Sequence, residues 1–161
     1  MQTTRLSKGL ALAAVIGLLA LPLGAGVQPA QAHGDEGVDL EIHMGSMFFQ
    51  LHKQNGEEVD AAKNAPIRVK AGEELVIRFE NMSKAMHEVH FGKEAVKGED
   101  GHFVRYEKRL FGDDFLGLHV EGGGSAKLHI KIPEDKTGKW ELGCFIPGHY
   151  AAGMKTPLII E

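Results

Sequence analysis

Short segments in which apolar and polar residues alternate recur along much of this 161-residue chain. They are found at residues 38–42, 67–69, 75–79, 126–132, 140–144 and 157–160. A period of two places the apolar side chains on one face of an extended strand, and Gly, Pro and Asn residues separate the segments. The pattern predicts an all-β protein, an antiparallel sandwich or barrel, and no internal repeat is visible.

Residues 92–124 interrupt the alternation. Residues 92–101 are polar, residues 103–118 are weakly amphipathic, and three consecutive glycines at 122–124 are typical of a flexible turn. We therefore expect the sandwich to carry a partly helical insertion around residues 92–124.

The first 32 residues have the features of an export signal. Arg5 and Lys8 precede an apolar run that ends at Val27, and Ala30-Gln31-Ala32 fits a cleavage site. A proline and two glycines interrupt the second half of the run, which favours cleavage over a membrane anchor. We predict a signal peptide at residues 1–32 and a single periplasmic domain at residues 33–161, with no stable membrane insertion after cleavage.

The predicted mature domain is mildly acidic. It keeps 16 Lys and Arg residues against 22 Asp and Glu residues, which gives a formal charge of −6. Because the charges are scattered, they provide no electrostatic attraction for nucleic acid or for an anionic membrane. We expect no nucleic-acid partner.

The chain has one cysteine, Cys144. In an oxidising compartment a lone cysteine is buried and inert, paired between chains, or protected as a metal ligand. His149 and Met154 follow it at five-residue steps in one loop. Thiolate and thioether sulfur suit Cu(I), and imidazole also suits Cu(II), so this combination favours the interpretation as copper ligands.

A His2Cys site with a distant methionine is the ligand set of blue-copper centres, so a second histidine is needed. We expect it on a different strand from Cys144. A predicted strand ends at Asn81, and His87 opens the next one. There His87 and Val89 share one face, while Glu88 and His90 share the other. If Val89 points to the core, His87 is the ligand and His90 faces water.

With these residues in place, the chain resembles the small type 1 copper cupredoxins over residues 65–91 and 125–161. The run Cys144-Phe145-Ile146-Pro147-Gly148-His149 is similar to the loop of azurin, in which the His-to-Met spacing is one residue shorter. Plastocyanins have the longer His-to-Met spacing but a shorter Cys-to-His spacing, and the combination here is most similar to the auracyanins. Met86 stands where Gly or Pro is common in these carriers, and Glu88 stands where Asn is common.

The resemblance implies a Greek-key β-sandwich that holds one copper ion, cycling between Cu(I) and Cu(II). His87, Cys144 and His149 would be the equatorial ligands, and Met154 the weak axial ligand. It also implies a monomeric one-electron carrier without enzymatic activity. Its redox partner proteins would dock near His149.

Further soft donors leave other functions open. The predicted mature chain has nine histidines and five methionines, and several of them cluster: His43 and Met44 with Met47, Met82 with Met86, and His90. They could hold additional copper in a copper-tolerance or copper-handling protein, although packing is the simpler interpretation of Met44 and Met47. A third possibility is a copper enzyme in which signal cleavage exposes the amino group and imidazole of His33 as chelating ligands.

Overall fold

The computed structural model describes residues 37–161, and within this range the chain forms strands and turns without a helix. The predicted signal peptide, its cleavage site and His33 lie outside the described residues. In the described part, no helix exists that could span a membrane.

The first sheet has five strands in the order β3-β2-β1-β5-β9. Their bounds are β1 Leu40–Gly45, β2 Phe48–Gln54, β3 Glu57–Glu58, β5 Glu74–Asn81 and β9 Ser125–Lys131. Strand β1 pairs antiparallel with β2, and β5 pairs antiparallel with β9. Strands β1 and β5 are parallel, with Ile42 opposite Phe79.

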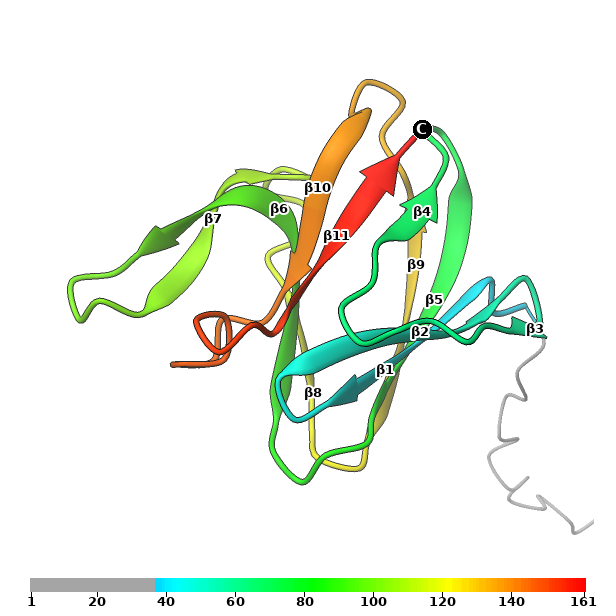
Figure 1. Ribbon diagram of the computed structural model, residues 1–161. Coiled ribbons are helices and arrows are strands. Elements are labelled where there is room, and N and C mark those ends of the chain that lie inside the picture. Colours follow the sequence, from blue (N-terminus) through cyan, green and yellow to red (C-terminus); the bar gives the residue numbers. More distant parts are fainter. Residues whose placement is uncertain (1–36) are drawn as a thin grey trace, which may run out of the picture. The chain divides into compact units, whose positions relative to one another are not determined.

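The second sheet has the strand order β4-β11-β10-β6-β7, and β8 pairs with the start of β6. Its strands are β4 Ile67–Val69, β6 His87–Lys97, β7 Phe103–Arg109, β8 Leu118–Val120, β10 Gly138–Gly143 and β11 Lys155–Ile160. Strands β4 and β11 are parallel. Figure 1 shows the far end of the β6–β7 hairpin projecting away from the two sheets.

The two sheets form a Greek-key β-sandwich around one hydrophobic core, as predicted. Inward residues of both sheets, such as Phe79 and Leu142, are almost completely buried. Burying a side chain of this size contributes about 1.5–3 kcal/mol relative to leaving it in water. Cys144 and Met154 belong to the same buried cluster, so the candidate ligand loop is anchored in the core.

Two expectations from the sequence are wrong. The sheets are mixed rather than purely antiparallel, because β1 pairs with β5 and β4 with β11 in parallel. The partly helical insertion around residues 92–124 is absent, because most of this segment lies in β6, β7 and β8 or in turns.

The turn after β7 explains why the sequence suggested a helix. Phe111 and Phe115 have a helix-like spacing, and both rings pack on Phe91 with centroid distances of 5.4 and 5.7 Å. Between them, Gly112 has a φ of 61°, which is incompatible with a right-handed helix and suits glycine. The aromatic residues therefore cover the core from a turn.

Candidate metal centre

Three strands deliver the four predicted ligands to one end of the sandwich. His87 is the first residue of β6. Cys144 directly follows β10, Met154 directly precedes β11, and His149 lies in the loop that joins β10 to β11. Strands β6 and β10 are neighbours, with His90 opposite Gly143. The pairing therefore brings Cys144 close to the start of β6.

The metal-binding atoms of His87, Cys144 and His149 all lie within 4.8 Å of one another. His149 Nδ1 is 3.2 Å from His87 Nδ1 and 3.4 Å from Cys144 Sγ. His87 and Cys144 are almost fully buried, with exposed fractions of 1% and 0%, whereas His149 is half-buried. Two imidazole nitrogens and a sulfur around one point form a donor set that fits copper.

Met154 is held against this group by the backbone. Its N–H donates to the His149 carbonyl at 3.0 Å, and its own carbonyl accepts from the Cys144 N–H at 3.1 Å. The Met154 side chain is fully buried. The loop closes through a turn at Gly148, whose φ of 88° lies in the left-handed region that suits glycine.

The other ring nitrogen of His87 has a partner that the sequence reasoning missed. Ser83 Oγ lies 2.9 Å from His87 Nε2 and also contacts Asn81 Oδ1 at 2.9 Å. The buried Asn81 in turn donates to the carbonyls of Ala85 and Val120. If Nε2 carries the proton, Nδ1 is left with its lone pair toward His149 and Cys144. A serine four residues before a candidate ligand was the available signal.

Glu88 takes part in the site through its backbone and turns its side chain away. Its N–H donates to Cys144 Sγ at 3.3 Å. Its carboxylate oxygens lie 3.0 Å from His90 Nε2 and 3.1 Å from His119 Nε2. As predicted from the alternation, Glu88 and His90 lie on the face opposite to His87. The expectation that His90 faces water is wrong, because its side chain is only 20% exposed and its ring packs against Phe145 with centroids 5.0 Å apart.

Burial sets the protonation of the three donors. It lowers the pKa of His87, with a further lowering from the neighbouring His149, and it lowers the pKa of His149 against a smaller opposing effect of Glu88. Burial raises the pKa of the Cys144 thiol, although hydrogen bonds from the backbone of Glu88 and Ile146 oppose this. Both imidazoles are thus neutral near pH 7, while a metal would have to displace the thiol proton.

Asn64 ties the ligand loop to the other sheet. Its side-chain amide donates to the Gly153 carbonyl at 3.1 Å, and its Oδ1 accepts from the Phe49 N–H at 2.9 Å. The loop before Met154 is therefore fixed to β2.

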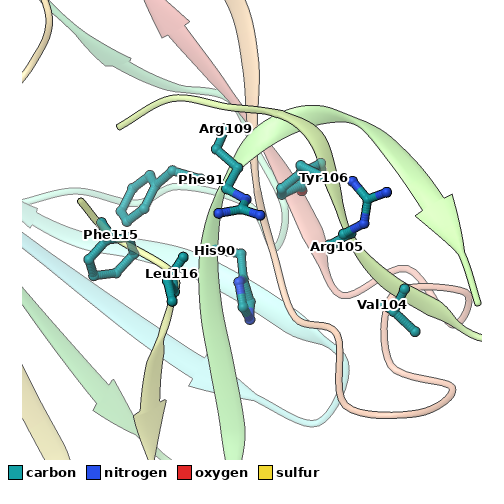
Figure 2. A pocket seen from close by; sticks show the side chains of 8 residues that line it. All are labelled: His90, Phe91, Val104, Arg105, Tyr106, Arg109, Phe115 and Leu116. Atoms are coloured by element: carbon teal, nitrogen blue, oxygen red, sulfur yellow. The ribbon is translucent and has the colours of Figure 1, made fainter. Parts of the chain in front are cut away.

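A pocket of about 140 Å³ lies against the β6–β7 hairpin. Figure 2 shows its lining residues, with Phe115 and Leu116 on one side of His90 and Tyr106 and Val104 on the other. None of the four predicted ligands lines this pocket. The candidate metal centre is thus a packed group of side chains, separate from this pocket.

The remaining soft donors have different positions. Met44 is completely buried in the core, as the packing interpretation expects, whereas Met47 and Met82 are exposed. Met86 is partly buried. His43 lies near Glu41 and His52 on the five-stranded sheet.

A family model of copper-binding proteins, the plastocyanin/azurin family, matches residues 40–161. The chain belongs to this family. Among solved structures, this cupredoxin is similar to reduced auracyanin from Roseiflexus castenholzii, with a TM-score of 0.50 and 20% identity over 75% of this chain and 94% of that one. It is also similar to reduced rusticyanin, with a TM-score of 0.50 and 17% identity over 75% of this chain and 78% of that one.

A curated relative of the cupredoxin is the copper-resistant cuproprotein CopI of Pseudomonas aeruginosa. The two are 26% identical, and the match covers 91% of this chain and 93% of the relative. The solved structures are similar in fold, whereas the relative's name concerns copper resistance.

Proposed function

We propose that this cupredoxin is an exported, periplasmic protein that binds one copper ion through His87, Cys144, His149 and Met154 and carries single electrons. The observation that supports this most directly is the convergence of two imidazole nitrogens and one thiol within 4.8 Å. When bound at such a set of donors, copper supplies a one-electron redox couple, because soft sulfur suits Cu(I) and imidazole also suits Cu(II).

The protein's own residues limit how far these donors move. Ser83 holds the far nitrogen of His87, the Glu88 N–H holds Cys144 Sγ, and two backbone hydrogen bonds hold Met154. A site fixed in this way needs little rearrangement when its charge changes by one. The half-buried His149 gives a partner protein an approach to the centre.

Direct electrochemistry tests the carrier function. We expect a reversible one-electron wave from the copper-loaded protein that is lost in Cys144→Ser. His90→Ala serves as a matched control, since it removes an imidazole from β6 on the opposite face, and it should keep the wave. A wild-type protein that binds copper without a reversible wave would contradict the carrier proposal.

Copper tolerance is a second candidate function, favoured by the similarity to CopI along nearly the whole chain. In this role the protein would bind periplasmic copper, at the same centre and at additional Met and His donors such as the exposed Met47 and Met82, rather than serve a respiratory chain. Deleting the gene should then lower the copper concentration at which the cells still grow, and the wild-type protein should restore growth where Cys144→Ser does not. A deletion strain that tolerates the same copper concentrations as the wild type would exclude this role.

A further inference from the structure

A second group of metal-binding side chains lies on the five-stranded sheet, whereas the four proposed copper ligands belong to the other sheet and its loop. Glu41 and His43 come from β1 and His52 comes from β2, and their ligand atoms all lie within 4.8 Å of one another. Two imidazole nitrogens point to one carboxylate oxygen: His43 Nε2 is 2.9 Å and His52 Nε2 is 3.9 Å from Glu41 Oε1.

A β-bulge produces this arrangement. In the β1–β2 pairing, Glu41 is opposite Lys53 and Ile42 is opposite Leu51, so His52 is the extra residue between them. A bulge changes the direction of the side chains around it. Here it brings both His52 and Lys53 beside Glu41.

The rings of His43 and His52 are stacked, with centroids 4.1 Å apart and planes at 22°. Their side chains are 19% and 35% exposed, while that of Glu41 is only 6% exposed. A carboxylate buried to this degree needs polar partners, and the two histidines and Lys53 Nζ, 3.6 Å from Oε2, surround it. Glu80 adds a second carboxylate, 3.9 Å from His43 Nε2.

We propose that Glu41, His43 and His52 form a second metal site, which takes a divalent transition ion and prefers Cu(II). Imidazole and carboxylate suit borderline divalent ions, and without a sulfur donor the site does not favour Cu(I). Among such ions Cu(II) generally binds most tightly to a given set of donors. The site has no part in the electron-transfer proposal and stands independently of it.

The geometry needs little adjustment to hold an ion. Cu(II) with nitrogen and oxygen ligands prefers a tetragonal arrangement, in which adjacent donors at metal distances of about 2.0 Å lie about 2.8 Å from one another. Donors already within 4.8 Å reach this spacing through small rotations of two partly exposed imidazoles. A surface depression of about 430 Å³ lined by Gln50, His52, Glu58, Val59 and Asp60 gives solvent and ions access beside His52.

The test titrates Cu(II) into the metal-free, full-length exported protein and follows binding by electron paramagnetic resonance and calorimetry. The spectra separate a type 1 signal from a second signal with larger copper hyperfine splitting. We compare the wild type with His43→Ala and His52→Ala. The matched control is His129→Ala, which removes an exposed histidine from β9 of the same sheet.

We expect the second signal in the wild type and in His129→Ala. In His43→Ala and His52→Ala its dissociation constant should rise at least about tenfold, since even the loss of an outer-shell partner costs a metal site about 10–100-fold. The type 1 signal should persist in all four proteins and shows that each variant is folded. If it is missing from all four, thermal unfolding reports the fold instead, and the second site is still judged on its own signal.

Equal second-site binding in all four proteins would overturn the proposal and assign the ion to other donors, such as an exposed amino terminus. Absence of any second signal would overturn it as well. Should His43→Ala fail to fold, the more exposed His52 decides the outcome alone. Lys53→Met is a further variant with the opposite expected effect. It removes a positive charge 3.6 Å from Glu41, so it should strengthen cation binding. Weaker or unchanged binding in this variant would count against the site.

Discussion

At the scale of single residues, we expect Ser83 to fix which nitrogen of His87 is available to a metal. Its hydroxyl lies 2.9 Å from Nε2, on the far side of the ring from His149 and Cys144. In Ser83→Ala, His87 loses the partner that fixes its tautomer and ring orientation. We expect copper affinity to fall about 10–100-fold, as is typical when a metal-binding histidine loses its outer partner.

Competition with a copper chelator measures this change. Ser125→Ala is the matched control, because Ser125 is an exposed serine at the start of β9. An unchanged copper affinity in Ser83→Ala would show that Ser83 does not position His87.

The buried donors also predict how the metal-free protein responds to pH. The pKa values of His87 and His149 are lowered from 6.5, so below about pH 6.5 the unfolded chain binds protons that the folded one does not. Stability should therefore fall as the pH decreases below this value. The pKa of Cys144 is raised from 9.0, so above about pH 9.0 the unfolded thiol ionises while the folded one keeps its proton. Stability should fall again there.

Denaturant unfolding of the metal-free protein across this pH range checks both slopes. Cys144→Ala should remove the alkaline decrease that the thiol causes and leave the acidic decrease in place. An alkaline slope identical in wild type and variant would contradict the shifted thiol pKa.

At the scale of elements, the β6–β7 hairpin depends on a close approach at Gly92. A Cβ atom at this position would lie 2.5 Å from Tyr106 Cβ and 2.6 Å from the Lys108 carbonyl oxygen. Gly92→Ala must therefore push β7 away from β6. We expect a loss of about 1–3 kcal/mol in the free energy of unfolding, the usual range for overpacking.

Gly98→Ala is the control for this prediction. It lies in the same hairpin, and its new Cβ would meet the Val104 side chain at 3.1 Å rather than backbone. Thermal or urea unfolding should show a smaller loss for Gly98→Ala than for Gly92→Ala. The reverse order would contradict the close approach at Gly92.

The sequence predicted strands where alternation was regular, as at Leu75, Ile77 and Phe79 in β5. It did not predict β2, because the adjacent Phe48 and Phe49 and the bulge at His52 obscure the period of two. The parallel pairing of β1 with β5 could not be predicted, because a strand with one buried face shows the same alternation whether its neighbour runs parallel or antiparallel to it. The prediction of a helix after β7 was wrong because Phe111 and Phe115, which lie in a turn, have a helix-like spacing.

For the whole molecule, the two groups of metal-binding side chains differ in how much of each is visible in the sequence. Cys144, His149 and Met154 share one loop, so their spacing was visible in the sequence, and only His87 had to be found on another strand. Glu41, His43 and His52 come together only through the β1–β2 register and its bulge. The sequence offers His43 as a spare donor, but nothing in it pairs His43 with His52.

The fold places the first group at one end of the sandwich, where the loop after β10 is anchored in the core. The central claim is that His87, Cys144, His149 and Met154 bind copper there as a type 1 site. The visible absorption spectrum of the copper-loaded protein tests it most directly. We predict an intense thiolate-to-copper band that is absent in Cys144→Ser, strongly altered in His87→Ala and retained in His90→Ala. A copper-loaded wild type without this band, or a band lost in His90→Ala and kept in His87→Ala, would contradict the account.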